Sequence, residues 1–295
     1  MINAFYFICR FLEEQTNWLF SLIEKQQSAI VVLSSTALVG AFAAYFGTVA
    51  AQKSINREVA LRLRIEKIAS ANAAHSLATV IFNQALSLKK QYFLPTFEKW
   101  HSQKTAAINA INTGQQPAEP LEIHMNSFPA FHFPLKELSD QIYGKLTLNG
   151  RPLAVISELF QASHTLVFLS EKHDRLEREF RGLPRDQVIA SYLSLPNQNG
   201  MDSRYQHICE GALLVIDDLI FFSNLLANDL IAYGQRQKKF APRRQRNLLP
   251  EVNKPGTLSP EFEYLVPNRE NHGRWLESHV LNEPQKPKLF KWFFS

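Results

Sequence analysis

The chain has 295 residues, of which 45% are hydrophobic and 20% are charged, and its formal net charge at pH 7 is +5. The apolar share leaves room for a buried core and excludes a wholly disordered chain. The positive balance is too small to indicate nucleic acid as a partner. The two cysteines, Cys9 and Cys209, lie far apart in the sequence, so we expect free thiols and no disulfide framework.

Residues 1–25 are rich in aromatic side chains and carry few charges. Aromatic rings with a polar edge favour the membrane interface, so this segment is predicted to be a helix that lies on the bilayer. A second membrane span over residues 2–23 is the alternative. It would place Arg10, Glu13 and Glu14 near the middle of the bilayer, where charges are costly.

The most informative segment is residues 26–52, which contain no charged residue. Crossing ~30 Å of hydrocarbon takes roughly 20 apolar residues in a helix, and this segment is long enough. We therefore predict a single transmembrane helix over residues 26–52. A buried core helix and a cleaved signal peptide are the alternatives, but the apolar run is longer than the usual signal core and follows a segment that is not basic.

The charges beside this span predict its orientation. Five cations follow it closely, whereas only Arg10, Lys25 and the amino terminus precede it. Because the cytoplasmic flank of a span carries the excess of Lys and Arg, the bulk of the chain is expected in the cytoplasm, anchored to an inner or plasma membrane. The five following cations are Lys53, Arg57, Arg62, Arg64 and Lys67.

Small residues recur within the predicted span. Gly40 with Ala44 and Ala43 with Gly47 form two small-xxx-small pairs. Such pairs let two helices approach closely in lipid, so they indicate a homo-oligomer held together by the span. Ordinary use of Ala and Gly in a membrane helix is the equally weighted alternative.

Helical patterns follow the span. Residues 53–94 lack Gly and Pro and have apolar residues at near-helical spacing, which predicts one helix continuous with the span. Pro95 is expected to bend or end it, with a continuation over residues 96–112. The loop of residues 113–134 contains four prolines. Further helices are expected at residues 135–143, 152–180, 185–193 and 203–238. Together these elements predict an all-α helical bundle over residues 53–239.

The segment of residues 240–295 contains seven prolines and is expected to be an extended or disordered tail, with a short helix near residues 272–280. A basic patch lies at the junction of the last helix and this segment, and we interpret it as a solvated helix end. Binding of anionic lipid and binding of a nucleic-acid backbone are the alternatives. Aromatic residues close it and are expected to dock on the bilayer, the bundle or another protein. The patch comprises Lys238, Lys239, Arg243, Arg244 and Arg246, and the aromatic residues are Phe290, Trp292, Phe293 and Phe294.

Motifs of known catalytic sites are missing from the sequence. It contains no His-Glu-x-x-His, no phosphate-binding P-loop, no Gly-x-Ser-x-Gly and no cysteine cluster. A di-iron bundle needs two Glu-x-x-His pairs on facing helices, and only the pair of Glu98 and His101 is present. We therefore expect no catalytic residue, no metal and no cofactor.

Two groups of polar residues fall on predicted helices. His164, Glu171, His173 and Asp174 share one helix and are interpreted as a solvated polar face, since the adjacent pair His173 and Asp174 points to different sides.

Asp217 and Asp218 interrupt the apolar run LLVIDDLIFF. Acids in such a place need partners or water. We expect one of them to be exposed and the other to pair with a cation of another helix, such as Arg62 or Arg64.

These features favour a non-enzymatic, membrane-anchored adaptor, signalling subunit or scaffold that acts through protein contacts. A membrane effector that perturbs the bilayer on oligomerising, of the toxin or defence type, is the alternative. An enzyme is a third possibility that rests only on scattered polar residues. A protein partner and the membrane itself are the expected binding partners.

Overall fold

The computed structural model describes residues 12–19, 21, 29–114, 120–146, 148–197 and 200–279, with side chains of α2 described from Gly40 onward. These residues are predominantly helical, and the only strands among them form one short antiparallel ladder. The prediction of an all-α chain is therefore confirmed. The chain divides into two compact units, Met1–Leu63 and Arg64–Ser295.

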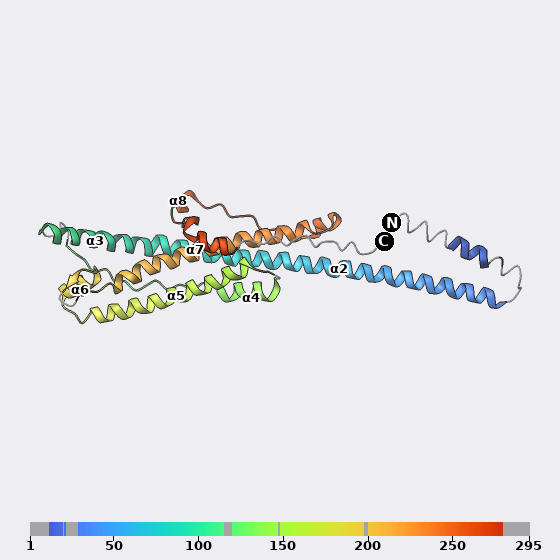
Figure 1. The fold of residues 1–295 in the computed structure, drawn as a ribbon, viewed down its shortest axis with the longest axis horizontal. Coiled ribbons are helices and arrows are strands. Elements are labelled where there is room, and N and C mark those ends of the chain that lie inside the picture. The colour runs from blue at the N-terminus through green and yellow to red at the C-terminus, as the bar shows by residue number, and fades with distance from the viewer. Residues whose placement is uncertain are drawn as a thin grey trace. The chain divides into compact units, whose positions relative to one another are not determined.

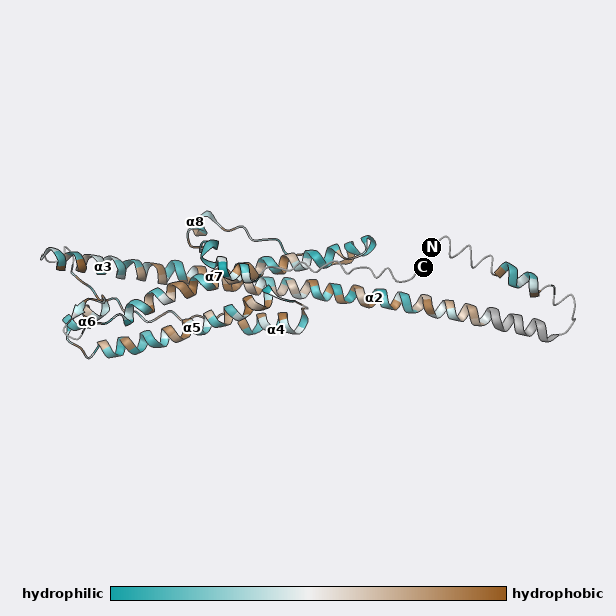
Figure 2. Ribbon diagram, viewed as in Figure 1, coloured by the Kyte–Doolittle hydropathy of each residue, from teal (hydrophilic) through white to brown (hydrophobic). Residues whose placement is uncertain are grey.

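The first unit contains a helical segment at residues 12–19 and the first part of α2, which spans Ala29–Leu88. The side chains of residues 40–60 in α2 are all exposed. Apolar colours prevail along the described start of α2, and hydrophilic colours appear further along the helix (Figure 2). In the sequence, the first charged residue after this apolar stretch is Lys53. Among the described residues of its unit, this part of α2 therefore presents exposed apolar side chains.

The second unit begins within α2, which continues into the π-helix η1 (Lys89–Phe93) and then α3 (Leu94–Thr113). Pro95 lies in the first turn of α3. Proline has no N–H to donate and its ring crowds the carbonyl four residues earlier, and the wider π turn just before it accommodates both effects. Pro95 thus changes the helical register instead of ending the helix, and Gly114 ends α3 in the left-handed conformation with φ 65°.

The other helices of the bundle lie close to the predicted ranges: α4 is Leu135–Lys145, α5 is Arg151–Phe180, α6 is Arg185–Tyr192 and α7 is Arg204–Lys239. The two-residue strands β1 (Pro196–Asn197) and β2 (Gly200–Met201) pair between α6 and α7. α5 and α7 lie side by side and make the most extensive helix–helix contact (Figure 1).

Two groups of buried apolar residues hold this unit together. The larger one joins α2, α4, α5 and α7, and small alanines of α2 let the helices approach closely. The smaller one surrounds Trp100 of α3, whose indole Nε1 donates to the Tyr192 carbonyl at 2.8 Å. The buried α2 residues of the larger group are Ala71, Ala74, Ala78, Ile81, Ala85 and Leu86.

Residues 240–279 were expected to be extended or disordered, and we find instead that they pack on the bundle. They contain η2 (Arg243–Leu248), α8 (Pro260–Glu263), η3 (Arg269–His272) and α9 (Gly273–Ser278), joined by extended chain. Leu265 is fully buried against the larger core, and the indole of Trp275 donates to Glu158 Oε1 at 3.0 Å. Prolines prevent long helices here but do not prevent docking.

Among the described residues, α5 is the one helix long and apolar enough to cross a membrane by length and composition. Core helices of soluble domains meet the same criterion. In this structure α5 packs on α7 and contributes Ile156, Leu159 and Leu166, each 0% exposed, to the core. The predicted span over residues 26–52 extends beyond the described side chains and stays a prediction.

Leu265 offers a test of this docking. Leu265→Ala should destabilise the docked segment by about 2–5 kcal/mol, because it removes a fully buried side chain and leaves a cavity. Trypsin should then cleave faster at the exposed Arg269 and Arg274. The control is Tyr264→Ala, since the neighbouring Tyr264 is 65% exposed. Equal cleavage rates in the two variants would contradict the docked arrangement.

Candidate functional site

The four small residues predicted to contact a second copy of the chain all lie on exposed helix. Gly40, Ala43, Ala44 and Gly47 belong to α2, and a Cβ added at either glycine would meet nothing within 4 Å. The helix surface is thus open at these positions. Self-association through them stays a prediction.

The predicted basic patch divides into two parts. Lys239, Arg243 and Arg244 are exposed, whereas Lys238 and Arg246 are half-buried. The Arg246 guanidinium donates to two backbone carbonyls, those of Lys239 at 3.0 Å and Ala241 at 3.1 Å. Arg246 therefore closes the C-terminal end of α7, where carbonyls lack helical partners, and the other cations remain available to a ligand.

Two groups of predicted positions remain, the aromatic residues near the C-terminus and the Glu-x-x-His pair. Phe290, Trp292, Phe293 and Phe294 lie outside the described residues. Glu98 and His101 are both exposed on α3, and the His101 ring stacks on Phe97 with the ring centroids 5.8 Å apart.

The expectation for Asp217 and Asp218 is correct in part: Asp217 pairs with a cation of another helical segment, but this cation is Lys89 and not Arg62 or Arg64, and Asp218 is half-buried instead of exposed. Asp217 accepts from Lys89 Nζ at 2.6 Å, and Asp218 lies 2.9 Å from His272 Nε2. Both partners come from segments remote in the sequence, so helical spacing gave no indication of them. The acids serve to join α7 to its neighbours.

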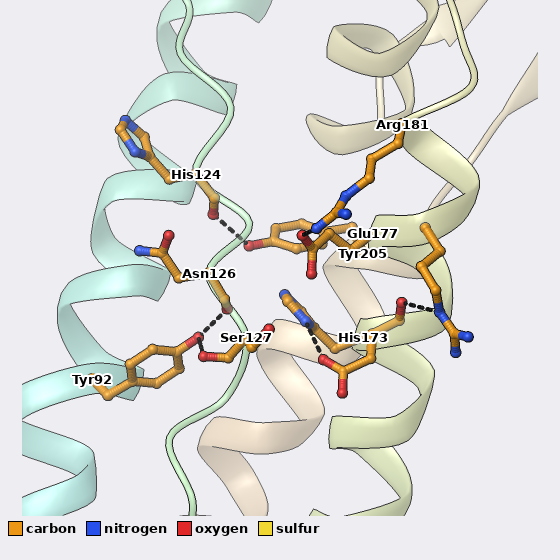
Figure 3. Close-up of polar contacts among 10 residues, drawn as sticks. Tyr92, His124, Asn126, Ser127, His173, Glu177, Arg181 and Tyr205 are labelled. Carbon is orange, nitrogen blue, oxygen red and sulfur yellow. Dashed lines mark hydrogen bonds and ion pairs between the residues drawn. The ribbon is translucent and has the colours of Figure 1, made fainter.

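A polar cluster lies where α5, η1 and the loop 120–134 meet (Figure 3). The interpretation of its α5 members as a solvated face was wrong for His173, which is only 2% exposed, although His164 and Glu171 are exposed. The face was misjudged because the loop 120–134 covers that part of α5, with Phe128 packed 4.9 Å from the His173 ring between centroids.

Three potential ligands of this cluster come from one helix. One donor atom each of His173, Asp174 and Glu177 can be chosen so that all lie within 4.8 Å of one another. His173 Nδ1 is 3.6 Å from Asp174 Oδ1, which is beyond hydrogen-bonding distance, and neither atom has a hydrogen-bond partner. Glu177 Oε1 accepts from Arg181 Nη2 at 2.6 Å.

The loop is tied down above the cluster by a tyrosine of η1. The Tyr92 hydroxyl donates toward the carbonyls of Asn126 and Ser127 (Figure 3). Burial raises the Tyr92 pKa to about 12, and the negative groups Asp174 and Glu177 add to the effect. Tyr92 is therefore a stable donor at neutral pH, and it holds Ser127 beside Glu177.

Aromatic rings form the floor of the cluster. Tyr205 lies 5.9 Å from the His173 ring and 4.5 Å from Tyr192 between centroids, and its hydroxyl donates to the His124 carbonyl at 3.3 Å. Burial raises the pKa of Tyr205 and of Tyr192. Both rings stay neutral and exclude water from one side of the imidazole.

The charge states of the cluster suit acceptance of a proton or a cation. Burial lowers the His173 pKa, although Asp174 and Glu177 act in the opposite direction, so the imidazole is neutral at pH 7. The Arg181 hydrogen bond lowers the Glu177 pKa, so this carboxylate is ionised. Burial raises the pKa of the nearby Cys209 thiol to about 12, which leaves it protonated and unreactive.

Compared with models of known protein families, with curated proteins and with solved structures, the chain matches none of them. The functional argument therefore depends on the geometry and chemistry of its own residues.

Sequence reasoning missed Glu177. The signal was present, because His173 and Glu177 are four residues apart on a helix and therefore share one face. Attention to the adjacent pair His173 and Asp174 obscured this spacing. Tyr92 and Ser127 gave no such signal, since they reach the cluster from other segments through tertiary packing.

The buried imidazole predicts a pH dependence of stability. The folded pKa of His173 lies below its ordinary value of 6.5, so below pH 6.5 the unfolded chain takes up the proton first. The contribution of the buried, neutral His173 to the free energy of unfolding is complete above pH 6.5. It is lost as pH falls toward the folded pKa, with a slope of at most about 1.4 kcal/mol per pH unit.

His173→Gln should therefore flatten the fall in the free energy of unfolding between pH 7 and pH 5. The measurement is denaturant unfolding of the detergent-solubilised chain with a chelator present. The exposed His164 supplies the matched control, and His164→Gln should keep the wild-type slope. The same slope in both variants would show that His173 does not contribute.

Proposed function

We propose that the protein is a membrane-anchored scaffold or signalling subunit that acts through protein contacts of its helical bundle, without catalysis of its own. The continuity of α2 supports this proposal most directly. One helix carries the exposed and uncharged residues 40–52 and, further along, the fully buried side chains of Ile68 and Ile81. The predicted anchor and part of the bundle core thus belong to one continuous helix, with no loop between them.

The exposed part of the basic patch supports contact with lipid. Lys239, Arg243 and Arg244 are accompanied by two exposed apolar side chains, Phe240 at 63% and Leu248 at 62%. Cations attract anionic headgroups, at about 1 kcal/mol each near the surface, and apolar side chains insert among them. This combination of exposed cations and apolar side chains suits the anionic surface of a cytoplasmic leaflet.

A cleft between α5 and α7 supports a protein partner. It has a volume of about 320 Å³, and its lining places Lys172, Arg175, Arg204 and His207 around a floor that includes Ile208. Glu179 also lines the cleft and pairs with Arg204 at 2.6 Å. The remaining excess of positive charge suits an acidic side chain of a partner.

Membrane anchoring is tested by a charge in the middle of the predicted span. Ala41→Arg should shift the chain from the carbonate-resistant membrane fraction to the soluble fraction, because a central arginine costs about 2.5–3.5 kcal/mol on insertion. Val59→Arg is the control: it adds the same charge at an exposed position of the same helix outside the span. A wild-type chain that carbonate washes off would contradict the anchor.

The partner is tested by a photo-crosslinking residue at the exposed position His207, on the cleft. In native membranes we expect a discrete adduct with one protein. Arg175→Glu should abolish it by reversing a cleft charge, whereas Arg178→Glu should leave it intact, since exposed Arg178 lies on the same helix and does not line the cleft. No adduct, or equal loss in both variants, would contradict a partner at this cleft.

A further inference from the structure

We propose that His173, Asp174 and Glu177 bind one divalent transition-metal ion, with Zn²⁺ or Fe²⁺ as the chemical class. The inference concerns the interior of the bundle and does not depend on the proposed membrane anchor or on a protein partner.

The first observation is a pair of buried polar atoms that face one another at ion-pair distance but without a hydrogen bond. His173 is 2% exposed, and its Nδ1 has no hydrogen-bond partner. Asp174 Oδ1 is buried and likewise has none. A buried donor or acceptor without a partner is unfavourable, because it has lost its hydrogen bonds to water. Two such atoms in one cluster indicate a missing ligand between them, and the His173 ring is directed into this cluster (Figure 3).

The second observation is the distance between these atoms. Nδ1 of His173 lies 3.6 Å from Oδ1 of Asp174. Two ligand atoms about 2.0–2.2 Å from a tetrahedral zinc ion are roughly 3.4 Å apart. The observed separation is too long for a hydrogen bond but close to the distance between two ligand atoms of one metal ion. A small side-chain rotation would bring both atoms to ligand distance from the same ion.

The third ligand follows from helical spacing. Glu177 lies one turn after His173, and its donor atom is within 4.8 Å of the other two. Arg181 Nη2 binds Glu177 Oε1 at 2.6 Å, and this second contact orients the carboxylate as outer partners of metal ligands do. The Asp174 side chain is 48% exposed, which gives an ion a path from solvent.

The donor set decides the class of ion. One imidazole nitrogen with two carboxylates suits Zn²⁺ or Fe²⁺, whereas Ca²⁺ and Mg²⁺ prefer oxygen alone. Three protein ligands leave a fourth position for water.

An ion at this position would stabilise the contact between α5 and the loop 120–134. Phe128 of the loop packs on the His173 ring, and the Tyr92 hydroxyl binds the carbonyls of Asn126 and Ser127 beside it. Fixing His173 therefore restrains the loop that covers it. The effect should appear as slower amide exchange in residues 120–134 when metal is present.

The test uses the full-length, tag-free chain in detergent, stripped with chelator and then titrated with Zn²⁺, or with Co²⁺ as a spectroscopic substitute. We expect one equivalent of metal per chain by elemental analysis after dialysis. With Co²⁺ we expect the visible absorption band that is typical of an ion with a low coordination number. Glu177→Gln and His173→Gln should each weaken binding about tenfold or more. Glu171→Gln and His164→Gln, at exposed positions of the same helix, should bind as wild type.

Two outcomes would overturn the proposal. One is the absence of stoichiometric metal in a folded wild-type chain. The other is equal binding by the Glu177 and Glu171 variants, which would indicate adventitious surface binding. Circular dichroism separates loss of metal from loss of fold, and Glu177→Gln keeps the test decisive if His173→Gln does not fold, since the Glu177 side chain is 20% exposed and retains its volume.

Discussion

The buried ammonium of Lys89 joins three segments that lie far apart in the sequence. Its Nζ donates to Asp217 of α7 at 2.6 Å and to the Leu265 carbonyl of the C-terminal segment at 2.8 Å. Lys89 is 8% exposed, and a buried charge that loses one partner is strongly destabilising. The positions of α7 and of the C-terminal segment on the first long helix therefore depend on this cation, and the π turn before Pro95 sets where it points.

Polar pairs also position the rest of α7. Its apolar contacts do not by themselves fix how far α7 is shifted along its neighbours, because hydrophobic burial is non-directional. Three of its acids each bind a different segment through a directional contact. Asp229, only 4% exposed, pairs with Arg151 at the start of α5, and Asp218 binds His272 of η3. Each pair admits one arrangement of its two segments, so together they restrict how the bundle assembles.

The helices could be predicted from sequence because their determinants are local. Gly114 and Pro184 mark helix boundaries through backbone geometry that neighbouring residues alone decide. The docking of residues 240–279 could not be predicted, since it depends on Leu265 and Trp275 meeting surfaces more than a hundred residues earlier. Proline content indicates the lack of long helices but carries no information on tertiary contact.

The polar cluster shows the same division between local and tertiary information. The spacing of His173 and Glu177 was readable, but the burial that makes it significant comes from Phe128 and Tyr205. An exposed His and Glu at this spacing would be an ordinary solvated pair. The loop helps to bury His173 Nδ1 and Asp174 Oδ1 without a hydrogen-bond partner, whereas three acids of α7 each bind a lysine, an arginine or a histidine of another segment. A divalent ion bound between these two atoms would give each of them the partner that the surrounding residues do not supply.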